Sequence, residues 1–169
     1  MHTAGVRDAL RTLLTRELRA AQRAIEIYPD DASVWRAVPG MPNSGGTLAL
    51  HLAGNLRHFL GALARDGYQR DRDAEFARRD VPRDELLAEL DAAIESVERS
   101  IEELSDEALS RVYPLPIGDG RVQTLTWLMH LASHLAYHLG QLDYHRRAVT
   151  GNAKGVDAVS VRELPKVQS

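Results

Sequence analysis

Three histidines repeat at four-residue intervals in the segment HLASHLAYHLGQ, which covers residues 130–141. Four residues are close to one turn of an α-helix, so His130, His134 and His138 are expected on one face of a helix. Two imidazoles one turn apart can share a divalent metal ion that lies about 2 Å from each ring nitrogen. His130 and His138 would be about 12 Å apart along the axis, so one ion would be held by one adjacent pair. The spacing alone allows either pair.

The surroundings of these histidines are apolar rather than polar. Leucines flank them on the same helix, so some of the imidazoles must face the core. A buried imidazole is costly unless it has a hydrogen-bond partner or a metal ion. The segment therefore supports two interpretations, a pair of metal ligands or histidines that are satisfied inside the core or an interface.

A third ligand would have to come from another helix. His51 lies in GGTLALHLAGNL between leucines, which predicts that it faces inward. His58 is seven residues later, on a similar face but two turns away, and is a weaker candidate. His145 lies beside two arginines near a helix end, where it could be a surface residue that favours the negative end of the helix. His2 lies in a terminus that we expect to be mobile.

Four segments show apolar residues at three- and four-residue intervals, which is typical of amphipathic helices. They cover about residues 6–28, 44–66, 80–104 and 124–149. With no convincing strand, the sequence predicts an all-α fold, a four-helix bundle over residues 1–150. Residues 151–169 are expected to form an irregular C-terminal extension, either loose or packed as an arm on the body or on a partner subunit. The polar connection before the third helix is long, and such connections are usually functional or cross over the bundle.

Composition excludes several classes of function. The 169 residues suit one domain, and the absence of cysteine excludes disulfides, thiolate metal sites and cysteine nucleophiles. The net charge of −3 does not call for a nucleic-acid partner, and the arginines of residues 70–79 alternate with acidic residues rather than forming a basic patch. Neither a signal-peptide core nor a membrane-spanning apolar run occurs, so we expect no membrane partner and a cytoplasmic location.

Three stretches of the chain resemble the DinB-like superfamily. HLASHLAYHLGQLDYHRR, residues 130–147, resembles the signature of its last helix, in which an H-x3-H-x-G-Q pattern recurs. LALHLAGNLRHFLGAL, residues 48–63, resembles its second-helix motif, whose histidine supplies another metal ligand. GYQRDRDAEF, residues 67–76, is similar to one branch of the superfamily. The resemblance covers about residues 5–148.

This resemblance implies an antiparallel four-helix bundle with a long crossover connection, often assembled as a homodimer. It implies that a metal ion, zinc or nickel by similarity, is held by His51, His134 and His138. His138 matches because it precedes LGQ, and His134 lies one turn earlier. His130 then falls outside the ligand set, either supporting it or on the substrate side. The amides of Asn55 and Gln141 could accept hydrogen bonds from the histidine ligands or could simply pack between helices. Tyr137 and Tyr144 of the last helix are expected to be packing residues.

Three protein ligands would leave a coordination position for water or substrate, unlike a closed structural site. Some relatives transfer low-molecular-weight thiols or act as thiol-dependent isomerases, and others resemble hydrolases. The resemblance thus implies a metal-dependent enzyme, a thiol S-transferase or hydrolase-like protein, with a small-molecule thiol or an electrophile as substrate. His130 and Glu75 are candidate general bases, although Glu75 could equally be a solvated loop charge. The alternatives are a dimeric metal-binding, stress-related module without turnover, and a plain bundle with core histidines.

Overall fold

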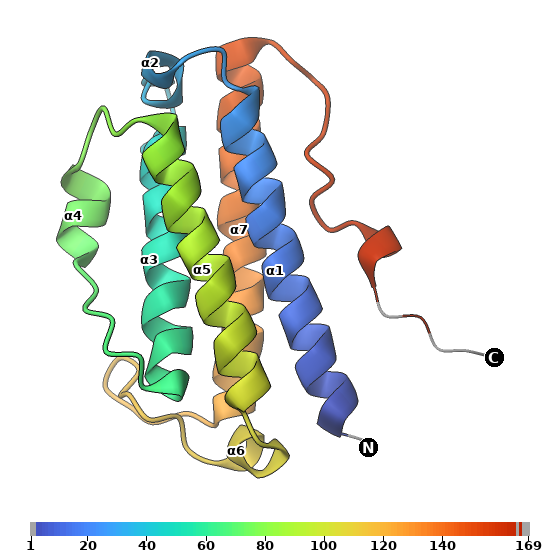
Figure 1. The fold of residues 1–169 in the computed structure, drawn as a ribbon. Helices are drawn as coiled ribbons and strands as arrows, with labels where there is room; N and C mark the ends of the chain where they lie inside the picture. The colour runs from blue at the N-terminus through green and yellow to red at the C-terminus, as the bar shows by residue number, and fades with distance from the viewer. Residues whose placement is uncertain (1–2, 165, 167–169) are drawn as a thin grey trace.

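Four long helices lie side by side in the computed structural model, which describes residues 3–164 and residue 166 (Figure 1). They are α1 (Thr3–Ile27), α3 (Gly45–Ala64), α5 (Arg83–Glu103) and α7 (Thr124–Thr150). The described residues contain isolated β-bridges but no strand, so the predicted all-α fold is confirmed. The predicted helices agree with these bounds to within a few residues. None of the described helices is long and apolar enough to cross a membrane. His2, which we expected in a mobile terminus, lies outside the described residues.

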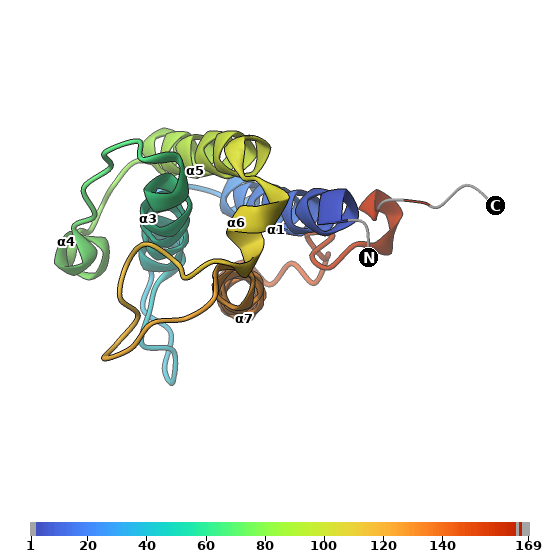
Figure 2. The same ribbon diagram turned by 90° about the horizontal axis from the view of Figure 1, so that it is seen from below.

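The directions of the long helices explain the long connection in the middle of the chain. Figure 1 shows α1 and α7 running one way and α3 and α5 the other. After α3 the chain must therefore return to the end at which α3 began, and residues 65–82 make this return. They include the short helix α4 (Arg72–Ala77), which lies against the outer side of α3 (Figure 2).

Three more short helical segments complete the fold. Helix α2 (Asp31–Val34) follows α1, and α6 (Asp106–Ser110) follows α5. A short 3-10 helix, η1 (Val161–Glu163), lies near the C-terminal end of the described chain.

Side chains at the helix ends determine where α3 and α4 begin. Ser44 precedes α3 and accepts a hydrogen bond from the Thr47 N–H, as expected for an N-cap serine. Asp71 does the same for α4 by accepting from the Ala74 N–H. The start of α4 is thereby fixed one turn before Glu75, a residue that becomes important below.

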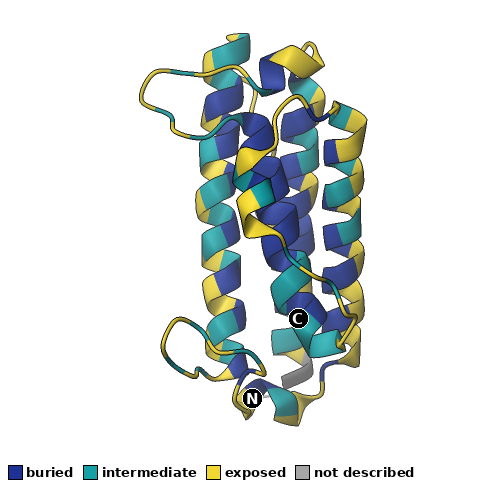
Figure 3. Ribbon diagram, turned by 90° about the vertical axis from the view of Figure 1, so that its left-hand side faces the viewer, coloured by how far each residue is buried: buried dark blue, intermediate teal, exposed yellow. Residues whose placement is uncertain are grey.

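Helix α3 is the most deeply buried of the long helices. It packs against α5 and α7 and is covered on its remaining side by α4 (Figure 3). Even its polar residues Thr47, His51 and Asn55 are buried. A polar side chain in the middle of α3 must therefore find its partners in the protein or in a bound ligand.

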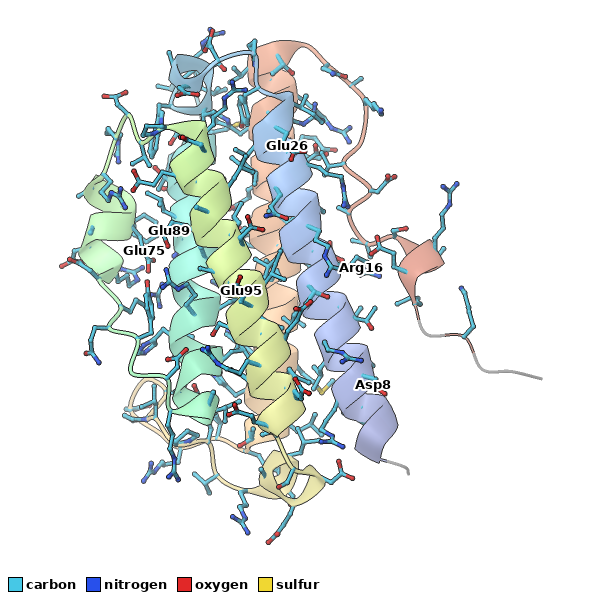
Figure 4. The ribbon with its side chains drawn as sticks, in the orientation of Figure 1. Asp8, Arg16, Glu26, Glu75, Glu89 and Glu95 are labelled. Carbon is cyan, nitrogen blue, oxygen red and sulfur yellow. The ribbon has the colours of Figure 1, made fainter. Side chains whose placement is uncertain are left out.

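The segment after α7 packs along α1. Val156 is buried, and its carbonyl oxygen accepts a hydrogen bond from Arg23. Arg16, labelled in Figure 4, is also buried and donates to the carbonyl oxygen of Ser160. At the end of α7 the fully buried Arg146 donates to two carbonyl oxygens of residues 152–154. These bonds hold the segment against the body of the bundle.

Candidate metal centre

The imidazole rings of His51, His134 and His138 converge between α3 and α7. One ring nitrogen of each lies within 4.8 Å of the others, and the ring centroids are 4.5–5.3 Å apart. His134 and His138 come from successive turns of α7, and His51 faces them from the antiparallel helix α3. The spacing is close to that of nitrogens that share one ion at about 2 Å. These three residues could therefore hold a metal ion.

His51 is oriented by a buried carboxylate. Its Nδ1 lies 3.0 Å from Oε2 of Glu75, which Figure 4 shows between α4 and α3. Arg70 holds the same carboxylate through two hydrogen bonds of 2.6 and 2.8 Å. With Nδ1–H donating to Glu75, Nε2 of His51 is left as the atom that can bind a metal, the arrangement found in carboxylate–histidine–metal triads.

The environment of Glu75 keeps this carboxylate ionised. Burial alone would raise its pKa, but hydrogen bonds from Arg70 and His51, together with their charges, hold the pKa below its usual range. The close approach of Glu75 to α3 requires glycine at position 54. A Cβ atom there would collide with the Glu75 carboxylate.

His138 is oriented by an amide on its own helix. Its Nδ1 lies 2.7 Å from Oε1 of Gln141, so Nδ1–H donates and Nε2 is left for a ligand. Burial lowers the pKa of His138, and the hydrogen bond to Gln141 opposes this only in part. Burial, followed by the neighbouring histidines, lowers the pKa of His134 to about 4. Both rings are therefore neutral at pH 7, the form that binds metal ions.

A cavity of about 340 Å³ opens onto the three histidines. Its lining has three parts: the histidine group with Asn55, an aromatic wall, and two arginines of the long connection. The lining residues beyond the three histidines are Asn55, Phe59, Arg70, Arg72, Phe76, Trp127, His130 and Leu131. The size is within the range of small-molecule sites.

A model of the DinB superfamily matches residues 13–142. The chain belongs to the DinB superfamily. The matched region includes all three converging histidines, together with Glu75 and Gln141, so this DinB-superfamily chain carries the whole centre within its family domain. A comparison with curated protein sequences finds no significant match.

The other histidines in the described part of this DinB-superfamily chain lie outside the group. His130 is exposed and stacks on Trp127, with centroids 4.8 Å apart and planes 12° from parallel. His58 contacts Phe59 instead. Of the two pairs that the spacing allowed, the structure thus brings His134 and His138 together with His51. His130 remains at the cavity, 6.1 Å from His134 between ring centroids.

His145 is not the surface residue that its position beside two arginines suggested. It is 1 % exposed, and Nδ1 lies 2.7 Å from the hydroxyl of Tyr28. Nε2 lies 2.9 Å from the carbonyl oxygen of Arg36. The chain after α1 folds over this end of α7 and covers the ring, which the sequence around His145 does not reveal.

The predictions made for the two amides and the two tyrosines have different outcomes. Gln141 does accept a hydrogen bond from a histidine of the group. Asn55 is buried at the cavity, but its Oδ1 contacts no hydrogen-bond donor among the described residues. The expectation that Tyr137 and Tyr144 are packing residues is wrong, because both lie on the outer face of α7 and are 66 % and 67 % exposed.

Sequence reasoning missed most of the residues around the histidines. The part played by Arg70, Arg72 and Phe76 depends on how the connection folds back onto α3, which no local pattern encodes. The available signals were the length of that connection and the resemblance of residues 67–76 to one branch of the superfamily. Trp127 could have been found one turn before His130 on the same helix.

Proposed function

We propose that this DinB-superfamily chain is a metal-dependent enzyme whose divalent ion is held by His51, His134 and His138. The observation that carries the proposal is the convergence of three imidazoles at a cavity large enough for a small substrate. Neutral imidazoles suit zinc or nickel, as the family resemblance also implies. Three protein ligands leave room for a water molecule or a substrate atom.

An ion in such a site acts as a Lewis acid and favours deprotonation of a bound water or thiol at neutral pH. The chain's own residues prepare the site for this chemistry. Glu75 and Gln141 fix the orientation of two ligand rings, and Phe76 and Trp127 line the cavity with aromatic surface. We propose a thiol S-transfer or a hydrolysis as the reaction class.

The two candidate bases fit different roles. Both carboxylate oxygens of Glu75 already accept hydrogen bonds from Arg70 and His51, so we assign it a positioning role. His130 is exposed at the cavity and makes no hydrogen bond to another described residue, so it is free to exchange a proton with a substrate. Stacking on Trp127 holds its ring in place.

Metal content and turnover test the proposal together. Metal analysis by mass spectrometry is made on the purified wild type and on His51→Ala, His134→Ala and His138→Ala, with His130→Ala as the matched control. We expect the three variants to lose the metal and His130→Ala to keep it. A full metal complement in all three would show that the ligand assignment is wrong.

The same proteins are then assayed with a panel of low-molecular-weight thiols and a chromogenic electrophile, and with ester substrates. We expect turnover by the wild type that a chelator abolishes and zinc or nickel restores. Metal binding without turnover on any of these substrates would instead support a non-catalytic metal-binding module.

We also interpret the four long helices as the antiparallel bundle with a crossover that the resemblance implies. The opposite directions of α1 and α3, and the return of the chain through residues 65–82, support this interpretation.

We further propose that two copies of the chain pair through the outer face of α7. Its exposed residues between positions 126 and 144 include no carboxylate, ammonium or guanidinium group; they are Thr126, Met129, His130, Ser133, Tyr137, Gly140 and Tyr144. A hollow of about 410 Å³ lies between the tyrosines and residues 40–43, where a partner's side chains could insert. Exposed large apolar side chains such as Met129, Tyr137 and Tyr144 on one face are typical of protein interfaces. Sedimentation velocity should show a wild-type dimer and a Tyr137→Glu monomer, whereas a monomeric wild type would contradict the pairing.

A further inference from the structure

The ionisable residues that line the cavity are all basic. They are two arginines and four histidines, and no Asp or Glu is among the lining residues. The carboxylate of Glu75, which is not among the lining residues, is already bonded to Arg70 and His51. A cavity that carries one sign of charge between apolar walls attracts ligands of the opposite sign.

The two arginines at the cavity differ in how their charges are balanced. Arg70 forms a two-bond ion pair with Glu75, so its charge is compensated within the protein. Arg72 forms no ion pair with any residue in the described part of the chain. Its guanidinium instead lies over the ring of Phe76, 4.9 Å from the ring centroid. Arg72 is therefore the cation that is available to a ligand.

Phe76 places this guanidinium close to the histidine group. It lies one turn after Arg72 on α4, and its ring centroid is 4.9 Å from that of His51. One aromatic ring thus contacts both the free cation and one of the three histidines. Trp127, which also lines the cavity, contacts Phe59 and stacks on His130. Aromatic walls of this kind favour a flat, apolar ligand body.

A third feature is an unused acceptor inside the cavity. Asn55 is 6 % exposed and lies one turn after His51 on α3. Its Oδ1 is buried without a hydrogen-bond partner among the described residues. A buried acceptor without a partner is unfavourable, and a ligand N–H or O–H group would satisfy it.

We propose that the cavity binds a small anionic ligand whose carboxylate or phosphate group pairs with Arg72. The flat apolar body of this ligand lies between Phe76 and Trp127, and its hydrogen-bond donor group reaches Oδ1 of Asn55. This inference rests on the proposed function in one respect, because it makes this ligand the substrate presented to the metal ion. It adds the substrate's charge, which the three histidines alone do not specify.

Calorimetric titration of the zinc-loaded protein tests the charge requirement. The probes are benzoate, phenyl phosphate and the uncharged analogue benzamide. We expect at least one of the two anions to bind about 10-fold or more tightly than benzamide, because hydrogen bonds to charged groups are the stronger ones. The ranking of benzoate against phenyl phosphate identifies the anionic group. Benzamide binding as tightly as both anions would overturn the proposal.

Arg72→Gln tests the assigned cation without disturbing the core, because Arg72 is exposed. We expect it to weaken binding of the preferred anion by about 10-fold while leaving the zinc affinity unchanged. Arg162→Gln removes the same exposed charge from η1, outside the cavity lining and on the opposite side of the molecule from α4 (Figure 1), and should change the affinity by no more than about twofold because exposed distant charges are screened. Equal anion affinity in Arg72→Gln and wild type would overturn the proposal.

A zinc titration of the wild type separates this proposal from the function on which it rests. If the wild type does not bind zinc, the metal-dependent function fails. The same comparison of Arg72→Gln and Arg162→Gln is then made on the metal-free protein. An anion affinity that still depends on Arg72 would support the anion site by itself, and one that does not would overturn it.

Discussion

Helix α7 carries two histidine environments seven residues apart that differ in how their ring nitrogens are used. At His145 both nitrogens have protein partners, the hydroxyl of Tyr28 and the carbonyl oxygen of Arg36. At His138 one nitrogen bonds Gln141, and the other faces His134 and His51. Burial alone does not separate a candidate ligand from a structural histidine, because His51 of the group is also buried. The difference is whether the protein supplies a partner for one nitrogen or for both.

The largest effect should come from removing the fully bonded histidine. His145→Ala leaves a cavity and deprives the Tyr28 hydroxyl and the Arg36 carbonyl of their partner. We expect the free energy of unfolding to fall by about 3–5 kcal/mol. Urea denaturation measures this loss, and mass spectrometry of the folded variant should still find the metal. A His145→Ala protein that is folded but free of metal would show that the two environments are not independent.

The next effect concerns the carboxylate behind His51. Glu75→Gln keeps the size of the side chain but removes the charge that holds the Nδ1–H tautomer. We expect the metal affinity to fall by about 10–100-fold, as is typical of such supporting groups. Competition with a chromophoric chelator measures it. Glu89→Gln is the control, because Glu89 pairs with Arg57 and does not contact a histidine; an equal loss in both variants would refute a specific role for Glu75.

A smaller effect on stability is expected when the Tyr28 hydroxyl, which bonds Nδ1 of His145, is removed. Tyr28→Phe removes one hydrogen bond to Nδ1 and leaves the ring of residue 28 in place. The free energy of unfolding should fall by about 1–2 kcal/mol. The metal affinity should not change, and a shift in it beyond experimental error would contradict the separation of the two environments. Urea denaturation and the chelator competition make the two measurements.

The smallest effect is a gradual dependence of stability on pH. Burial lowers the pKa of His145, although the hydrogen bond to Arg36 opposes it, and burial lowers the pKa of His134 to about 4. Histidines of the unfolded chain titrate near 6.5, so between about pH 6.5 and 4 the unfolded state binds more protons. The metal-free protein should therefore lose stability as the pH falls from 7 to 5. Constant unfolding free energies over this range, measured in urea, would contradict the assigned neutral states.

The long helices could be predicted from the sequence because each carries its own apolar stripe over many turns. The short helices α2, α4 and α6 could not, since four to six residues show too little periodicity. The directions of the long helices also lie outside local patterns. The length of the connection between α3 and α5, together with the crossover that the family resemblance implied, indicated that the chain returns outside the bundle.

The residues of the candidate site also divide into those that sequence motifs identified and those that only the fold brings together. Family motifs identified His51, His134 and His138, whereas spacing alone did not separate His134–His138 from His130–His134. Glu75 is 24 residues from His51, and their contact depends on the folded connection rather than on any repeat. His145 was misjudged for a similar reason, because the residues that cover it lie more than 100 positions earlier in the chain.

The wall of the cavity formed by α4 is built outside the four long helices. Its residues contribute Arg72 and Phe76 but few side chains to the main core, since α4 contacts chiefly α3. Evolution, or a protein engineer, could therefore change the cavity-lining positions 72 and 76 of this short helix to suit a different small molecule, provided that Glu75 is kept to orient His51. The histidine set would stay constant while the selectivity of the pocket diverged.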